Sequence, residues 1–187
     1  MQQKVLITGG SGLLAVNWAL SIRDNCSVVL ILHNRKISIP GVDSEVASLD
    51  SIKECLSVIN KYEPDVVIHT VGLANIEQCE KNADLAQHIN VDLSENIASA
   101  CNELNVKLVH ISTDHLFSGK NKMSTEDGDI KPINFYAKTK RWGELKAQEN
   151  CKDVLIIRTN FFGWGTKYRQ SFSDFILSSL KDGKSVN

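Results

Sequence analysis

Five short runs of apolar residues recur along the chain, and each is apolar almost throughout rather than at alternate positions. They are rich in β-branched residues, a pattern typical of strands buried on both faces of a parallel sheet. The runs predict strands over residues 4–8, 27–32, 65–69, 107–111 and 153–157. The stretches between them predict helices near residues 12–23, 51–61, 84–104 and 135–149. Strands alternating with helices in this way predict an α/β fold built on a doubly wound parallel sheet.

Two later segments depart from this alternation. Residues 117–134 are polar and broken by glycine and proline, which predicts a surface loop at the edge of a functional site. Residues 170–182 predict a last helix. The apolar residues of that helix fall at helical spacing and form one stripe, which consists of Phe172, Phe175, Ile176 and Leu180.

The composition narrows the class of protein. The 187 residues are 42% apolar with a formal net charge of −1, which suits one domain and not a strongly basic nucleic-acid binder. No apolar run approaches the roughly 18 residues of a membrane span, so no membrane segment is expected. The first strand begins almost at once, so no secretory signal is expected either.

Cysteine usage points to a cytoplasmic protein. The five cysteines are scattered, odd in number and never in a C-x-x-C pair, which predicts reduced thiols rather than disulfides or a zinc site. They are Cys26, Cys55, Cys79, Cys101 and Cys151. No other cluster suggests a metal site.

A glycine-rich turn follows the first predicted strand and precedes a predicted helix. Glycines in such a turn let the backbone approach a pyrophosphate, whose charge the first N–H groups of the helix can meet. The spacing fits a dinucleotide-binding turn that ends in Ala15 instead of a third glycine. The residues expected to contact the cofactor here are Gly9, Gly10, Ser11, Gly12, Leu13 and Leu14. Glycines that serve only a tight turn are the alternative.

The end of the second predicted strand indicates which dinucleotide is bound. An acidic residue at this place would hold the 2′-hydroxyl of NAD, but the sequence reads Asn34, Arg35 and Lys36 after His33. Arg35 and Lys36 can accept a 2′-phosphate, so NADP(H) is favoured, with NAD(H) as the alternative. A solvated basic turn without a ligand is the other interpretation.

Asp50 stands just before the next predicted helix. Its carboxylate could accept a hydrogen bond from the adenine amino group, or it could cap that helix.

A tyrosine and a lysine lie four residues apart on a predicted helix and hence on one face, at Tyr136 and Lys140. An ammonium group one turn away should lower the pKa of the phenol toward the working pH, so that Tyr136 could protonate a ketone oxygen. Thr113, or with less support Ser112, follows the fourth predicted strand and could hydrogen-bond the same oxygen. A surface Tyr–Lys pair and a turn that merely caps the strand are the plain alternatives.

These motifs together resemble the extended short-chain dehydrogenases/reductases, and within them the dTDP-4-dehydrorhamnose reductase group. The matching pieces occur in the family's order: TGGSGLLA at 8–15, LD at 49–50, PDVVIHTVGLANIEQCE at 64–80, N at 90, ISTDHLFSG at 111–119, KPINFYAKTKRWGE at 131–144 and RTNFFGWG at 158–165. Asn90 is expected only to pack within its helix. The departures are Ala15 and His115, where the family often has glycine and tyrosine.

The resemblance implies a Rossmann-type domain that binds a nicotinamide cofactor and reduces a 4-keto-6-deoxy nucleotide sugar. It implies a catalytic set of Thr113, Tyr136 and Lys140, with Lys140 also on the nicotinamide ribose and Gly72 letting the cofactor pass the backbone. Members of the family are longer than this chain. We therefore expect residues 1–160 to form the NAD(P)-binding domain and residues 161–187 to begin a substrate-binding region whose lobe is largely absent.

Other functions remain open at this point. A relative of the group is the regulatory beta subunit of methionine adenosyltransferase, so a non-catalytic NADP-binding protein is one alternative. A nucleotide-sugar epimerase or dehydratase is another. The sequence also leaves the oligomeric state open, a homodimer included.

Overall fold

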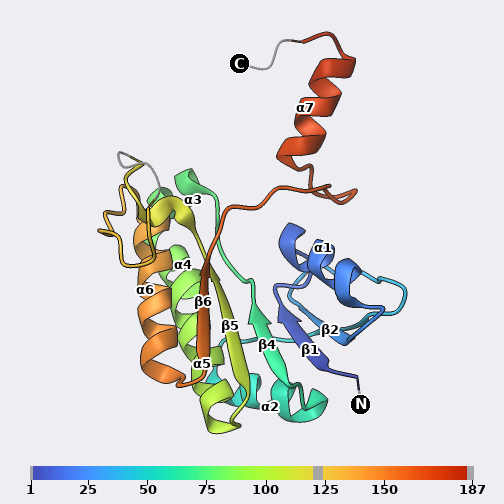
Figure 1. Ribbon diagram of the computed structural model, residues 1–187, viewed down its shortest axis with the longest axis vertical. Coiled ribbons are helices and arrows are strands. Elements are labelled where there is room, and N and C mark those ends of the chain that lie inside the picture. The colour runs from blue at the N-terminus through green and yellow to red at the C-terminus, as the bar shows by residue number, and fades with distance from the viewer. Residues whose placement is uncertain (1, 120–123, 185–187) are drawn as a thin grey trace.

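The computed structural model describes residues 2–119 and 124–184 and contains a parallel six-stranded sheet in the order β3-β2-β1-β4-β5-β6 (Figure 1). The strands are β1 (Lys4–Thr8), β2 (Ser27–Leu32), β3 (Asp43–Val46), β4 (Val66–His69), β5 (Lys107–Ser112) and β6 (Val154–Arg158). The strand order reverses between β1 and β4. In a doubly wound fold, ligands bind at the carboxyl ends of the strands beside that reversal.

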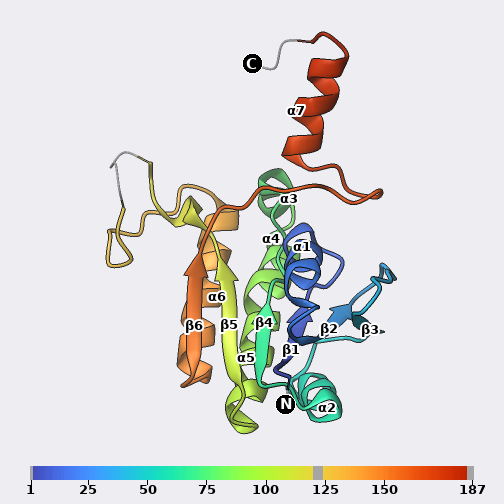
Figure 2. The same ribbon diagram turned by 45° about the vertical axis from the view of Figure 1, so that its right-hand side comes forward.

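Helices cover both faces of the sheet (Figure 2). The helices are α1 (Leu13–Ile22), α2 (Ile52–Tyr62), α3 (Ile76–Lys81), α4 (Ala83–Gln87), α5 (Leu93–Glu103), α6 (Phe135–Asn150) and α7 (Phe172–Lys181), with a π-helical turn η1 (His88–Asp92) and a 3-10 turn η2 (Asp114–Leu116). Successive strand residues face opposite sides. Leu6 packs with the core under α2 and α5, whereas Ile7 packs with the core under α1. The expected doubly wound α/β fold is confirmed.

The predicted elements agree with the structure where the pattern is local. All five predicted strands and the helices predicted near 12–23, 51–61, 135–149 and 170–182 are present within two residues. The helix predicted over 84–104 is confirmed as continuous helical backbone over residues 83–103, with the π-helical turn η1 between α4 and α5. β3 and α3 were not predicted: β3 is a largely exposed edge strand without an apolar run, and α3 is only six residues long.

The described part of the loop at 117–134 contains no helix or strand, as expected, while residues 120–123 of that prediction lie outside the described residues. Helix α7 stands apart from the sheet (Figure 1). Its apolar stripe is exposed, with Phe172 at 68% and Leu180 at 62% of full accessibility. No helix within the described ranges is long and apolar enough to cross a membrane.

Candidate active site

The glycine-rich turn between β1 and α1 is packed so closely that side chains would not fit. Gly9 has a positive φ of 70°, and a Cβ there would lie 3.0 Å from Thr70 Oγ1. A Cβ on Gly10 would lie 2.7 Å from the Cβ of Leu30, and its N–H donates to the Ile31 carbonyl at 2.9 Å. The turn is therefore fixed against the neighbouring strands β2 and β4.

Helix α1 begins at this turn without a side-chain cap. The N-cap residue is Gly12, which has no side chain to cap the helix, and the first turn holds no acidic residue. The leading N–H groups of a helix have no intrahelical acceptor and favour an anion. The turn and the helix end together fit a pyrophosphate.

A cavity of about 270 Å³ joins this turn to the predicted chemical groups. Of the predicted site residues, the cavity is lined by Gly9, Ser11, Gly12, Leu13, Leu14, Gly72, Tyr136 and Lys140. Gly10, Asn34, Arg35, Lys36, Asp50 and Thr113 are not among its lining residues. The sheet thus brings the glycine-rich turn and the Tyr–Lys pair, far apart in sequence, to one hollow at the carboxyl ends of β1, β4 and β5.

Tyr136 lies in the first turn of α6, whose N-cap Asn134 accepts a hydrogen bond from Ala137 N at 2.8 Å. Burial raises the pKa of Tyr136 above its usual value, and a hydrogen bond with Thr113 lowers it only in part. The expectation that the Lys140 ammonium brings this pKa down is not met: the pKa is raised, chiefly by the loss of solvent around the phenol, and Lys140 is not among its causes. Tyr136 is consequently protonated at neutral pH, which is the state of a proton donor.

Thr113 is held by the turn that follows β5. It is 4% exposed, and its hydroxyl oxygen accepts a hydrogen bond from His115 N at 3.2 Å as the N-cap of η2. The His115 ring packs edge-on against Tyr136, with 5.8 Å between the ring centroids. The histidine that departs from the family pattern therefore supports the tyrosine ring.

Lys140 is buried one turn further along α6. Its Nζ donates a hydrogen bond of 2.7 Å to the carbonyl oxygen of Ile111 at the end of β5. Burial lowers the pKa of Lys140 to about 8, against the opposing effect of the Glu144 carboxylate. The ammonium group is thus mostly charged at neutral pH but loses its proton more easily than a surface lysine.

Glu144 anchors the helix beneath this site. It is fully buried and accepts two hydrogen bonds from Arg158, each of 2.9 Å, and one of 2.8 Å from Arg141. Burial alone would raise the pKa of Glu144, but the hydrogen bonds from the two arginines contribute to holding it below its usual value. Arg158 also donates to the Glu126 carbonyl at 2.7 Å, which ties the loop after η2 to the sheet.

The basic turn after β2 is exposed but not isolated. The guanidinium carbon of Arg35 lies 4.4 Å from the centroid of the Tyr168 ring. Tyr168 Oη donates a hydrogen bond of 3.0 Å to the carbonyl oxygen of Ser11 in the glycine-rich turn. Arg35 therefore lies close to the turn that fits the pyrophosphate, although Asn34 and Lys36 extend into solvent.

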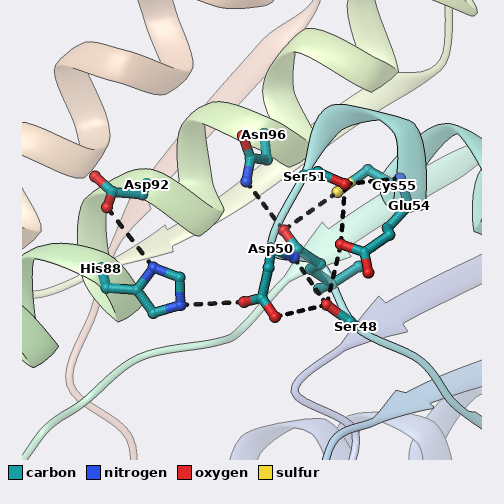
Figure 3. A network of polar contacts seen from close by, with 9 residues as sticks. Ser48, Asp50, Ser51, Glu54, Cys55, His88, Asp92 and Asn96 are labelled. Atoms are coloured by element: carbon teal, nitrogen blue, oxygen red, sulfur yellow. Dashed lines mark hydrogen bonds and ion pairs between the residues drawn. The ribbon is translucent and has the colours of Figure 1, made fainter.

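Asp50 belongs to a polar network at the start of α2 (Figure 3). Its carboxylate accepts a hydrogen bond of 2.7 Å from Ser48 and lies 3.1 Å from His88 Nε2. The bond from Ser48 lowers the pKa of Asp50 despite some burial. The alternative that Asp50 caps the helix is wrong, because Ser51 is the N-cap and accepts from Glu54 N.

Three residues at the site were missed or misjudged from the sequence. Phe161 and Arg169 line the cavity from the segment after β6. Phe161 falls within the RTNFFGWG match at 158–165 but was given no role there, and no motif marks Arg169. Asn90 was expected only to pack, but its side chain accepts from Leu73 N at 2.8 Å and donates to Thr139 at 3.0 Å. It joins the loop that carries Gly72 to helix α6, an arrangement that only the fold reveals.

Known proteins match this chain over most of its length. The spore coat polysaccharide biosynthesis protein SpsK of Bacillus subtilis is 30% identical over 179 residues, which are 95% of this chain and 58% of SpsK. The dTDP-4-dehydrorhamnose reductase of Salmonella typhimurium is 36% identical over 110 residues, 58% of this chain and 37% of that enzyme. The beta subunit of methionine adenosyltransferase 2 of Bos taurus is 30% identical over 156 residues, 83% of this chain and 46% of the subunit.

The fold matches as well. The crystal structure of dTDP-4-dehydrorhamnose reductase from Bacillus anthracis in complex with NADP superposes with a TM-score of 0.76 at 26% identity, over 97% of this chain and 61% of the other. This chain therefore spans about 60% of the length of such relatives. The family model for the RmlD substrate binding domain matches residues 3–187, and the chain belongs to this family, in agreement with the resemblance noted from its motifs.

Proposed function

We propose that this chain is the cofactor-binding part of an NADP(H)-dependent reductase that acts on a 4-keto-6-deoxy nucleotide sugar. The observation that carries the proposal is the single cavity in which Tyr136 and Lys140 face the glycine-rich turn. The Thr113 hydroxyl, whose influence lowers the pKa of Tyr136, adds the third group of the expected catalytic set. Relatives named dTDP-4-dehydrorhamnose reductase support the substrate class.

The residues fit a nicotinamide dinucleotide. The uncapped start of α1 and the glycines before it would hold the pyrophosphate, and Gly72 would let the cofactor pass. Arg35 would take the 2′-phosphate of NADP, and Asp50 the adenine amino group. NADP(H) is favoured because no acidic residue follows β2 to hold a free 2′-hydroxyl, with NAD(H) as the alternative. The Bacillus anthracis relative in complex with NADP supports this choice.

The reduction needs a hydride and a proton. A reduced nicotinamide bound at this site would supply the hydride that the ketone carbon takes up. Tyr136 donates the proton of its hydroxyl to the ketone oxygen, and its raised pKa keeps that proton in place until the oxygen gains negative charge. Thr113 orients the phenol by hydrogen bonding, and the Lys140 ammonium favours the phenolate that results. Lys140 would also hydrogen-bond the nicotinamide ribose.

The two parts of the chain would have different functions. We assign residues 1–160 to dinucleotide binding and residues 161–187 to the beginning of the substrate-binding region. Phe161 and Arg169, which line the cavity from that second part, support the division.

The test is NADPH oxidation by the intact protein with a dTDP-4-keto-6-deoxy sugar, followed by absorbance. Tyr136→Phe should reduce kcat by about 10² to 10⁴, the range for a lost general acid. Tyr62→Phe, at the far end of the sheet, is the matched control and should turn over like the wild type. Equal turnover by Tyr136→Phe and wild type would reject Tyr136 as the proton donor.

A second candidate function rests on the match to the methionine adenosyltransferase beta subunit. In that case the chain binds the dinucleotide and regulates a partner without turning over a sugar. NADPH binding by calorimetry, together with no NADPH oxidation in the wild type over a panel of 4-keto nucleotide sugars, would favour this candidate over the reductase.

A further inference from the structure

We propose that Tyr168 is a positioning residue that gives the cofactor site its selectivity for a 2′-phosphate. Its ring holds the Arg35 guanidinium beside the glycine-rich turn. This inference rests on the proposed binding of NADP(H) and goes beyond it, because it assigns selectivity to a residue in the segment after β6.

That segment returns to the cofactor side of the sheet. It leaves β6 and crosses toward α1 before α7 begins (Figure 1). Asn17 of α1 donates a hydrogen bond of 3.3 Å to the Trp164 carbonyl, and Tyr168 Oη donates one of 3.0 Å to the Ser11 carbonyl. Two bonds thus hold the segment against α1 and the turn before it.

Tyr168 connects this turn to the end of β2. Strands β1 and β2 are neighbours, and the Gly10 N–H donates to the Ile31 carbonyl at 2.9 Å, so the turn and the basic residues after β2 lie side by side. The Arg35 guanidinium carbon lies 4.4 Å from the centroid of the Tyr168 ring. One side chain therefore contacts both places where a 2′-phosphorylated cofactor would be held.

The geometry suits a phosphate ligand. A guanidinium group stacks on an aromatic ring through its face and binds phosphate through the N–H groups at its edge. Stacking on Tyr168 therefore leaves the edge for a phosphate. Arg35 is otherwise an exposed side chain, and ordering a long side chain during binding reduces affinity. The Tyr168 ring orders the Arg35 side chain before a ligand binds. Only a ligand with the 2′-phosphate gains affinity from this ordering.

The size of the effect follows from the exposure of the pair. Cation–π contacts at exposed sites correspond to about a two- to fivefold change in an equilibrium constant. The hydroxyl of Tyr168 acts differently, since it contacts the turn expected at the pyrophosphate, which both cofactors share. Losing the ring should change selectivity, whereas losing the hydroxyl should weaken both cofactors alike.

The experiment measures Kd for NADPH and for NADH by calorimetry in the wild type, Arg35→Gln, Tyr168→Phe, Tyr168→Leu and the double variant Arg35→Gln/Tyr168→Leu. We expect Tyr168→Leu to reduce the NADPH-over-NADH preference about two- to fivefold and Tyr168→Phe to retain it. In the Arg35→Gln background, Tyr168→Leu should cause no further loss of preference. Tyr62→Leu, which removes a ring near Lys61 at the opposite end of the sheet, is the control and should retain the preference.

Two kinds of failure are distinguishable. A wild type without NADPH preference, or an Arg35→Gln variant that keeps it, overturns the NADP(H) assignment and this inference with it. If Arg35→Gln loses the preference but Tyr168→Leu keeps it in full, only the role of Tyr168 is overturned. A lower Tm in Tyr168→Leu with an unchanged preference has the same meaning, because the ring then serves only to fasten the segment.

Discussion

The Nζ atom of Lys140 donates a hydrogen bond of 2.7 Å to the carbonyl oxygen of Ile111, which joins the middle of α6 to the end of β5. Tyr136 precedes Lys140 by one helical turn, and Thr113 follows Ile111 by two residues. The bond therefore fixes the relative position of the two hydroxyl groups that are expected to meet the substrate. It does so with a charged group that burial disfavours.

The buried ammonium predicts a pH-dependent stability. Burial lowers the pKa of Lys140 in the folded state to about 8, below its usual value of 10.5, so the unfolded chain binds more protons between these values. Stability therefore rises with pH through this window, and the destabilising effect of Lys140 is complete below about pH 8. Lys140→Met should lack this rise. Relative to the variant, the wild type should gain about 3 kcal/mol in free energy of unfolding from pH 8 to 10.5, at 1.36 kcal/mol per unit.

Urea unfolding of both proteins at several pH values measures that difference, and groups common to the two cancel. Parallel curves for wild type and Lys140→Met would show that Lys140 titrates normally in the folded state. Turnover should fall in the variant at every pH, since it lacks the ammonium group.

Thr113 should matter for catalysis through its hydroxyl group. Thr113→Val removes the hydroxyl expected to meet the ketone oxygen beside Tyr136 and should lower kcat roughly 10²-fold, the lower end of the range for a lost oxyanion donor. Thr113→Ser keeps the hydroxyl and should stay within a few-fold of wild type. Steady-state kinetics on the intact protein give both values. Equal losses in the two variants would mean that the threonine methyl group, and not the hydroxyl, is what the site needs.

The sheet and the glycine-rich turn could be predicted because both follow from patterns local to one segment. Strands buried on both faces leave apolar runs, and the turn leaves closely spaced glycines. The edge strand β3 leaves neither, since its residues Asp43–Val46 are largely exposed. The π-helical turn within the helix predicted over 84–104 leaves no local signal either. It lies where Gly143 of α6 packs so closely on the Asn90 carbonyl that a Cβ there would clash.

The site, too, contains residues that a local pattern predicts and residues that only the tertiary fold brings together. Tyr136 and Lys140 are related by helical spacing, so the sequence suffices to place them on one face. Tyr168 contacts Ser11 across 157 positions, and nothing in the polar stretch around it predicts that approach. Arg169 is beyond prediction for the same reason. Contacts of this kind depend on how the chain returns over the sheet.

Substitution of Arg169 should weaken cofactor binding without changing the preference between NADPH and NADH. It lines the cavity together with Ser11, Gly12 and Leu13 at the start of α1, where the pyrophosphate is expected. Arg169→Gln should weaken NADPH and NADH by a similar factor of about five, as for a lost exposed hydrogen bond worth about 1 kcal/mol. Lys167→Gln, in the same segment and exposed, is the control. A loss confined to NADPH would place Arg169 at the 2′-phosphate instead.

Substitution of Glu144 should lower the free energy of unfolding substantially. Glu144→Gln removes the charge of a fully buried carboxylate and leaves Arg141 and Arg158, whose side chains are 28% and 19% exposed, without the carboxylate that both contact. Breaking a buried ion pair costs 3–5 kcal/mol as a rule, and the partial exposure of the arginines places the loss at about 3 kcal/mol. Glu149→Gln on the same helix, where the carboxylate is 63% exposed, should change stability by less than about 0.5 kcal/mol. Urea unfolding compares them, and similar losses in both would contradict the assignment of an anchoring role to Glu144.

The stacked histidine pair beneath the site predicts acid sensitivity. His69 and His110 lie on β4 and β5 with ring centroids 5.5 Å apart, and among the described residues neither ring nitrogen of His110 has a hydrogen-bond partner. Burial, with smaller effects from Lys140 and His69, lowers the pKa of His110 well below 6.5. The unfolded chain therefore binds more protons below pH 6.5, and stability falls as the pH falls through that value. His110→Leu should be equal to the wild type or up to about 1 kcal/mol more stable at pH 7, because it removes unsatisfied polar atoms.

Between pH 6.5 and 5, His110→Leu should also lose less free energy of unfolding than the wild type, because it removes a group that binds a proton more readily in the unfolded chain. The remaining acid sensitivity belongs in part to His69, whose pKa burial lowers to about 3. Urea unfolding at pH 7, 6 and 5 separates the cases. A His110→Leu variant that loses stability at acid pH as steeply as the wild type would mean that His110 is protonated in the folded protein.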